Sequence, residues 1–88
     1  MMNTIEALAL ILTGINIELK NASGINGYLS KFFYDSNTNK ITEMWYDGEL
    51  DDYDFCDYTI AEFVIAATRM EKTMREVRHM PLMWVSVI

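Results

Sequence analysis

Carboxylates are the side chains of this sequence whose number and spacing point most directly to chemistry. Residues 41 to 68 include no Lys and no Arg, so their eight acidic side chains give a net charge of −8, against −6 for all 88 residues. These side chains are Glu43, Asp47, Glu49, Asp51, Asp52, Asp54, Asp57 and Glu62. A cluster of this kind can hold a hard cation or receive the Arg and Lys side chains of a partner.

Metal coordination is the first possibility. Asp35, Asn37 and Asn39 match the first three ligand positions of an EF-hand loop, but Lys40 replaces the Gly of that loop and Tyr46 replaces its final Glu. The later carboxylates lack any defining ligand spacing; they are Asp51, Asp52, Asp54 and Asp57. We therefore expect neither a bound metal nor a cofactor.

Catalysis would need a nucleophile and a base, and the chain has one cysteine, Cys56, and one histidine, His79. Cys56 lies among carboxylates, which disfavour a reactive thiolate. His79 lies near the expected C-terminus of a helix, where the helix dipole favours a cation. Without a third orienting residue the two form no catalytic constellation, so we expect a protein that is not an enzyme.

Recognition of a basic partner is the remaining possibility, and five aromatic rings lie among the acidic side chains: Trp45, Tyr46, Tyr53, Phe55 and Tyr58. Carboxylates pair with guanidinium groups and aromatic faces stack on them. In an extended chain Asp47, Glu49 and Asp51 would repeat at ~6.6 Å, about twice the ~3.4 Å rise per phosphate of one duplex strand. We predict a partner-binding segment made of Asp47, Glu49, Asp51, Asp52, Tyr53, Asp54, Phe55 and Asp57. The alternative is an acidic loop that only aids solubility.

Length and composition restrict the class of protein. A chain of 88 residues with 51% hydrophobic residues is expected to form one domain, residues 1–88, with its own core. A sequence pI near 4.5 argues against direct binding of nucleic acid. The single cysteine fits a reducing compartment, and we find neither a signal peptide nor a membrane-spanning stretch. We therefore expect a cytoplasmic protein.

Periodicity then predicts the elements that position the acidic segment. Hydrophobic spacing and a Thr4 or Asn3 cap indicate a helix through Leu12, and alternation over residues 15–19 indicates a strand. Residues 21–27 indicate a turn, and residues 28–34 and 40–46 a hairpin with a loop at 35–39. After an acidic loop, Thr59 and Glu62 form a capping box that starts a helix of about twenty residues, whose apolar stripe reaches Val77 before Pro81.

Residues 82–88 are apolar on both strand faces, which predicts a strand that is central in the sheet or buried in a homodimer. The long helix carries a basic second half that offsets the helix dipole, with Glu71 and Arg75 as an i,i+4 pair. The predicted fold is α+β, a small antiparallel sheet of three to four strands packed by two helices, in the order helix-strand-strand-strand-helix-strand.

This layout resembles the small phage-encoded anti-CRISPR proteins that act as DNA mimics: a short N-terminal helix, a three-stranded meander, a carboxylate-rich stretch and a second helix within ninety residues. The resemblance lies in layout and acidity and rests on no shared motif. It implies an inhibitor that fills the DNA-binding or motif-reading cleft of a CRISPR effector. Asp47, Glu49, Asp51, Asp52 and Asp54 would then take the place of phosphates. The basic half-helix and the apolar last strand depart from a pure mimic.

Two further classes stay open. An immunity protein or antitoxin that neutralises a basic nuclease toxin would have the same acidic character. A small structural or interaction subunit that forms a homodimer through its C-terminal strand is the second alternative.

Overall fold

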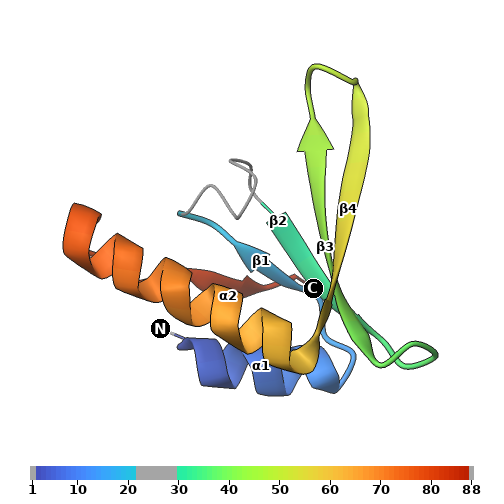
Figure 1. Cartoon of the computed structure of the whole chain (residues 1–88), viewed down its shortest axis with the longest axis horizontal. Coiled ribbons are helices and arrows are strands. Elements are labelled where there is room, and N and C mark those ends of the chain that lie inside the picture. Colours follow the sequence, from blue (N-terminus) through green and yellow to red (C-terminus); the bar gives the residue numbers. More distant parts are fainter. Residues whose placement is uncertain (1, 22–29, 88) are drawn as a thin grey trace.

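The computed structural model describes residues 2–21 and 30–87, which form one antiparallel sheet with two helices on one face (Figure 1). The sheet order is β4-β3-β2-β1-β5, with β1 Ile17–Leu19, β2 Ser30–Asp35, β3 Lys40–Asp47, β4 Asp52–Thr59 and β5 Trp84–Ser86. The helices are α1, Thr4–Leu12, and α2, Ile60–Thr73, which continues into a π-helical turn η1, Met74–Arg78. The predicted α+β class is confirmed, with one strand more than the expected order.

The additional strand is β4, which contains Asp52, Asp54 and Asp57 of the predicted partner-binding segment. The expectation of an acidic loop was wrong, because residues 52–59 pair with β3 along their whole length, from Asp47↔Asp52 to Lys40↔Thr59. Asp is uncommon in strands, so the alternation of Asp52 and Asp54 with Tyr53 and Phe55 did not indicate a strand. The predicted turn at 21–27, apart from Asn21, and the first two residues of the predicted strand at 28–34 lie outside the described residues.

Both helices begin with a capping box, which satisfies backbone N–H groups that a helix leaves without intrahelical partners. At α1 the Glu6 N–H donates to Asn3 Oδ1 at 2.8 Å and the Asn3 N–H donates to Glu6 Oε1 at 3.2 Å. At α2 the Glu62 N–H donates to Thr59 Oγ1 at 3.1 Å and the Thr59 N–H to Glu62 Oε1 at 2.9 Å. The predicted cap of α2 is confirmed, and of the two caps that the sequence offered for α1 it is Asn3, not Thr4, that caps the helix.

The second helix ends differently from the prediction. Its last turn, η1, is π-helical, and this extra residue per turn rotates the following side chains away from the apolar stripe. Met74 is still buried, whereas Val77 is 70% exposed, so the expectation that the stripe reaches Val77 was wrong. His79 then adopts a left-handed conformation with φ of 55°, which ends the helix before Pro81.

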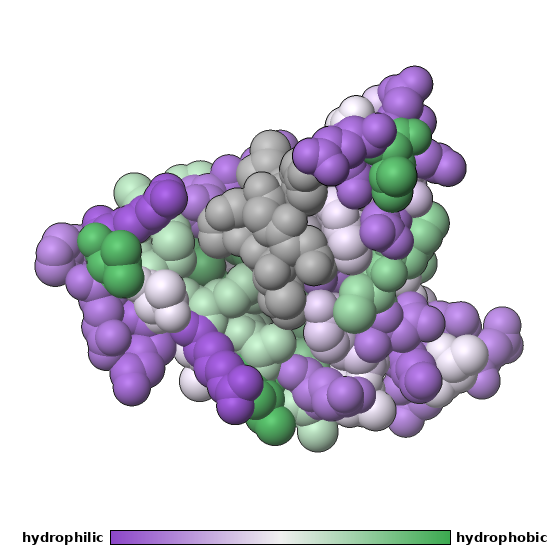
Figure 2. Space-filling model, turned by 45° about the horizontal axis from the view of Figure 1, so that its top comes forward, coloured by the Kyte–Doolittle hydropathy of each residue, from purple (hydrophilic) through white to green (hydrophobic). Residues whose placement is uncertain are grey.

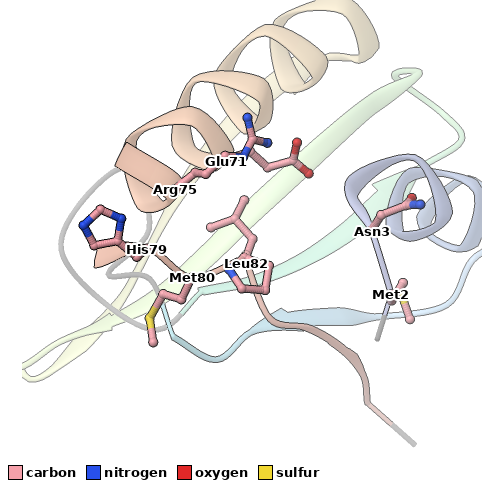
Figure 3. Close-up of a pocket in the computed structure, with 8 residues that line it drawn as sticks. Met2, Asn3, Glu71, Arg75, His79, Met80 and Leu82 are labelled. Carbon is pink, nitrogen blue, oxygen red and sulfur yellow. The ribbon is translucent and has the colours of Figure 1, made fainter. Parts of the chain in front are cut away.

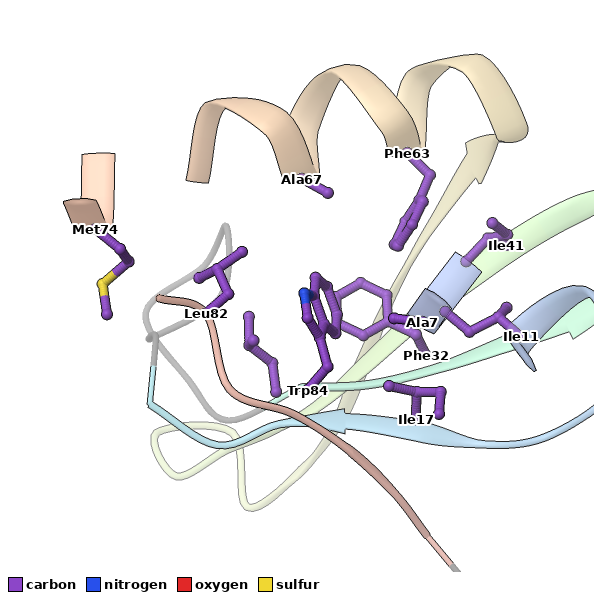
Figure 4. Close-up of a cluster of buried hydrophobic side chains, with 11 residues drawn as sticks. Ala7, Ile11, Ile17, Phe32, Ile41, Phe63, Ala67, Met74, Leu82 and Trp84 are labelled. Carbon is purple, nitrogen blue, oxygen red and sulfur yellow. The ribbon is translucent and has the colours of Figure 1, made fainter. Parts of the chain in front are cut away.

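The core lies between the helices and the sheet face that they cover (Figure 4). Phe32 of β2 packs edge-on against Phe63 of α2 and against Trp84 of β5, with ring centroids 5.5 and 5.4 Å apart. The remaining buried hydrophobic side chains of this cluster are Ala7, Ile11, Ile17, Leu19, Ile41, Ala67, Met74 and Leu82. Within the described residues no element covers the opposite face of the sheet, which we call the open face.

The C-terminal strand lies at an edge of the sheet. β5 pairs with β1 on one side, and Met2 forms an isolated bridge with Trp84. Leu82 and Trp84 are buried, whereas Met83 and Val85 are exposed. The central position that the sequence suggested for this strand is therefore wrong, and the homodimer remains a prediction. No helix of the described chain is long and apolar enough to span a membrane.

Candidate functional site

Residues 46–53 form the outer half of a long β3–β4 hairpin that projects from the sheet (Figure 1). Strand β2 pairs with β3 only as far as Ser30↔Trp45, so in the described chain residues 46–53 have each other as their only strand neighbours. At the other end of the hairpin, β4 runs directly into the capped start of α2. The base of the hairpin is therefore held by its pairing with β2 and by its direct connection to α2.

The pairing register divides the predicted site residues between the two faces of this hairpin. Directly paired residues of an antiparallel ladder share a face, and neighbours along a strand alternate. Asp47, Asp52 and Asp54 lie on the face that continues the helix-covered side, beyond the reach of the helices. Tyr53, Phe55 and Asp57 lie on the open face, where Tyr53 packs edge-on against Tyr46 with centroids 5.6 Å apart. One side of the hairpin is thus acidic and the other mainly aromatic.

The turn at residues 48–51 connects β3 to β4 and carries the remaining two predicted carboxylates, Glu49 and Asp51. The Glu49 N–H donates to Asp47 Oδ1 at 3.0 Å, and Asp51 has a left-handed φ of 51°. The Tyr46 hydroxyl donates to Asp51, and this bond is the main reason why the pKa of Tyr46 is raised above its ordinary value. Asp47, Glu49 and Asp51 therefore do not repeat along one extended chain, and the predicted regular spacing was wrong.

Two of the aspartates also have a local structural role. β4 is an edge strand, and the N–H groups of Tyr53 and Phe55 donate to Asp52 Oδ1 at 2.7 Å and Asp54 Oδ1 at 2.9 Å. These bonds occupy donors that an incoming strand would use, and carboxylates at a sheet edge discourage such pairing. Asp57 accepts a hydrogen bond of 2.7 Å from Thr42 on the open face.

Among the described residues, no cation forms an ion pair with a hairpin carboxylate. The ion pairs of the described residues both involve Glu18, with Lys20 at 2.7 Å and Lys31 at 3.6 Å. In the same residues the expected Glu71–Arg75 pair is not formed. Figure 2 shows hydrophilic side chains over the projecting hairpin and over the opposite end, where α2 and η1 end.

All eight predicted site residues lie on this one hairpin, and all are exposed except Asp47, which is half-buried. The structure adds Tyr46 and Leu50, which are large, exposed and adjacent to the predicted set. It also places a hollow of about 200 Å³ on the open face, with Lys31, Met44, Tyr46 and Tyr53 in its lining. Tyr46 could have been identified from its strand alternation with Trp45, which is buried.

Glu43 is one of the eight acidic side chains counted in the sequence, but it does not lie on the acidic surface. It is fully buried and accepts hydrogen bonds from Ser30 Oγ at 2.7 Å and from the Tyr58 hydroxyl at 2.8 Å. Burial is the main cause of the raised pKa of Tyr58, and the side chains of Cys56 and Glu43 add to it. Cys56 is half-buried beside this network, which agrees with a packing role.

His79 lies far along the chain from Cys56, in a second hollow of about 500 Å³ (Figure 3). This hollow is bounded by the end of α2 and η1, by residues 80–82 and by the residues before α1. Its ionisable lining residues are Glu71, Arg75 and His79, and Glu71 accepts a hydrogen bond from Thr4 of α1. In the described part of the chain no group of three or more His, Cys, Asp or Glu side chains could hold a metal ion.

These features define a small α+β domain with a projecting acidic and aromatic hairpin. Comparison with protein-family models, with curated proteins and with solved structures gives no match for this chain. Any function must therefore be argued from the hairpin itself.

Proposed function

We propose that this protein is a non-catalytic inhibitor whose β3–β4 hairpin occupies a basic nucleic-acid-binding cleft of a partner protein. The observation that carries the proposal is a group of six carboxylates within residues 47–57 of the projecting hairpin, five of them exposed and none with an ion-pair partner in the described chain. Keeping like charges this close costs stability, since Asp47 lies directly opposite Asp52. Such a cost is typical of a functional surface.

The two-faced hairpin suits insertion into a cleft better than docking on a flat surface. Asp47, Asp52 and Asp54 would pair with Arg and Lys on one wall, in the position of phosphates. Tyr53 and Phe55 would contact the other wall, where aromatic side chains commonly supply most of the binding free energy. The charges would mainly raise the association rate and set the salt dependence.

The resemblance to DNA-mimicking anti-CRISPR proteins makes a CRISPR effector in the host cytoplasm the first target to test. A basic nuclease toxin has a cleft of the same chemistry, and the immunity-protein alternative would then apply. With either target, this protein and nucleic acid should compete for the partner, because both would bind the same cationic side chains of its cleft.

The test compares three immobilised forms of the protein in host lysate at low and moderate salt. These are the wild type, the charge-reversed Asp52→Lys/Asp54→Lys variant, and a control, Asp35→Lys/Glu76→Lys, with the same change in net charge away from the projecting outer half of the hairpin. We expect the wild type and the control to retain a nucleic-acid-binding protein that duplex DNA or RNA displaces, and the hairpin variant to lose it. Equal retention by all three forms, or an empty eluate, would contradict the proposal.

The aromatic face is tested separately once the partner is purified. Phe55→Ala is expected to weaken binding by at least ~10-fold, mainly through faster dissociation, with little change in salt dependence. Asp54→Asn is expected to lower the association rate and flatten the salt dependence instead. If Phe55→Ala leaves the dissociation rate unchanged, the aromatic face does not contribute to the contact.

A further inference from the structure

The hollow at the end of α2 has the size and the lining of a small-molecule site. Its volume of about 500 Å³ lies within the range of roughly 300–1,000 Å³ that is typical of such sites. Three segments that are far apart in the sequence form it: residues 2–3, 71–75 and 79–82. Its apolar lining residues are Met2, Met80, Pro81 and Leu82. An apolar lining with a few charged groups is the usual composition of a ligand site.

Hydrogen bonds between distant segments hold the walls of this hollow in place. The Trp84 indole N–H donates to Thr4 Oγ1 at 3.1 Å, and the Thr4 hydroxyl donates in turn to Glu71. Thr4 and Trp84 are both buried, so these bonds are shielded from water. At the other wall, the Asn21 side chain donates to the Pro81 carbonyl at 2.8 Å. The hollow is therefore formed before a ligand binds, which lowers the entropic cost of binding.

The backbone beside the hollow departs from a regular helix in two places. The turn η1, which contains Arg75, is π-helical, and such turns occur frequently at functional sites. His79, which lines the hollow, has a left-handed φ of 55°, an uncommon conformation for a residue other than Gly. Backbone conformations of this kind are concentrated at active sites and ligand clamps. Both features therefore support a binding role for this hollow.

Two opposite charges line the hollow without neutralising each other. Glu71 and Arg75 have the i,i+4 spacing of a helical ion pair, but no ion pair forms between them. Glu71 is instead hydrogen-bonded to Thr4, and within the described residues the Arg75 guanidinium has no hydrogen bond or ion pair. Figure 3 shows both side chains on the side of α2 that faces Leu82. A carboxylate and a guanidinium beside an apolar surface match the two charges of a zwitterion.

We propose that this hollow binds a free α-amino acid with an apolar side chain, of the size of leucine or methionine. The Arg75 guanidinium pairs with the carboxylate of the ligand, and the Glu71 carboxylate pairs with its ammonium group. The side chain of the ligand lies against Met2, Met80 and Leu82, and methionine side chains adapt to ligands of different shape. The hollow lies at the opposite end of α2 from the hairpin, so this inference does not depend on the proposed function.

The two charges favour an amino acid over a simple anion or cation. Glu71 would repel a ligand that carries only a carboxylate, and Arg75 would repel a ligand that carries only an ammonium group. An amino acid satisfies both side chains at once. A ligand of this size has few atoms for contact, so the expected dissociation constant is roughly 0.1–1 mM.

Isothermal titration calorimetry of the whole chain with L-leucine tests the inference. Three related compounds each lack one part of leucine: isocaproate lacks the ammonium group, isopentylamine lacks the carboxylate, and glycine lacks the apolar side chain. L-leucine should bind, and each of the three should bind at least ~10-fold more weakly. Absence of L-leucine binding at ~10 mM, or equal binding of any of the three compounds, would overturn the inference.

Two variants with matched controls locate the binding site. Arg75→Gln and Glu71→Gln should each weaken L-leucine binding at least ~10-fold, because one charged contact is lost. Gln keeps an acceptor for the Thr4 hydroxyl, so the wall is preserved. The controls are Arg69→Gln and Glu76→Gln, which remove the same charges outside the lining and should change the dissociation constant less than ~2-fold. Circular dichroism verifies that all four variants fold. Binding of L-leucine that is unchanged in Arg75→Gln and in Glu71→Gln would contradict the proposed site.

Discussion

Glu43 shows how one residue of an acidic segment can have a purely structural role. Six of the other seven acidic side chains of residues 41–68 are exposed and Asp47 is half-buried, whereas Glu43 is fully buried with Ser30 and Tyr58 as hydroxyl donors. A buried carboxylate is tolerated only when hydrogen bonds replace the water that it loses. The donors come from β2 and β4, so Glu43 links the base of the hairpin to the rest of the sheet.

Removing one donor should therefore be costly. Tyr58→Phe is expected to lower the free energy of unfolding by about 1–3 kcal/mol, the cost of leaving a buried acceptor without its donor. The matched control is Tyr34→Phe, since the Tyr34 hydroxyl donates to Asn39 Oδ1 at 2.6 Å in an exposed position. The control should cost less than ~1 kcal/mol in the same urea titration. Equal losses would show that the buried carboxylate does not depend on Tyr58.

The raised pKa of Tyr58 also predicts behaviour at alkaline pH. A tyrosine titrates near pH 10 in the unfolded chain, whereas the folded protein keeps the Tyr58 proton to higher pH. The unfolded state therefore loses this proton first, and stability falls as pH rises above about 10. Tyr58→Phe lacks this titration, so its deficit relative to the wild type should narrow between about pH 9 and 11. A deficit that stays constant over that range would contradict the assignment.

At the scale of elements, the capping box of Thr59 and Glu62 at the start of α2 is the clearest local signal in the chain. Thr59→Ala removes the acceptor for the Glu62 N–H and should cost about 1 kcal/mol of stability. Thr68→Ala is the control within the same helix, because Thr68 Oγ1 donates to the Val64 carbonyl in an exposed interior position. Ala has the higher helix propensity there, so this variant should be neutral or slightly more stable. Urea unfolding of both variants at neutral pH makes the comparison.

These elements differ in how far the sequence determined them. The caps at Asn3 and Thr59 depend on residues within four positions of each other, so local patterns were sufficient. β4 depends on pairing with β3, and its aspartates are poor strand formers, so the sequence indicated neither this strand nor the two faces on which its acidic and aromatic side chains lie. The burial of Glu43 depends on hydrogen bonds from Ser30 and Tyr58, 13 and 15 positions away, which no local pattern contains.

For the stability of the whole molecule, the position of a charged side chain should have a larger effect than the net charge. Asp52→Asn and Glu18→Gln each remove one negative charge from a protein of net charge −6. Asp52 lies opposite Asp47 and has no cation nearby among the described ion pairs, whereas Glu18 pairs with Lys20 and Lys31. The pKa of Glu18 is accordingly lowered, chiefly by its hydrogen bond with Lys20.

At low salt and neutral pH, Asp52→Asn should therefore raise the free energy of unfolding by a few tenths to about 1 kcal/mol, and Glu18→Gln should lower it by a similar amount. Asn keeps the acceptor for the Tyr53 N–H, so the edge of β4 is preserved. Both effects should shrink in ~1 M salt, where charges are screened within about 3 Å. Changes of the same sign in both variants would mean that net charge governs stability. Opposite signs would show that this chain retains unfavourable charge specifically on the hairpin, as a binding surface requires.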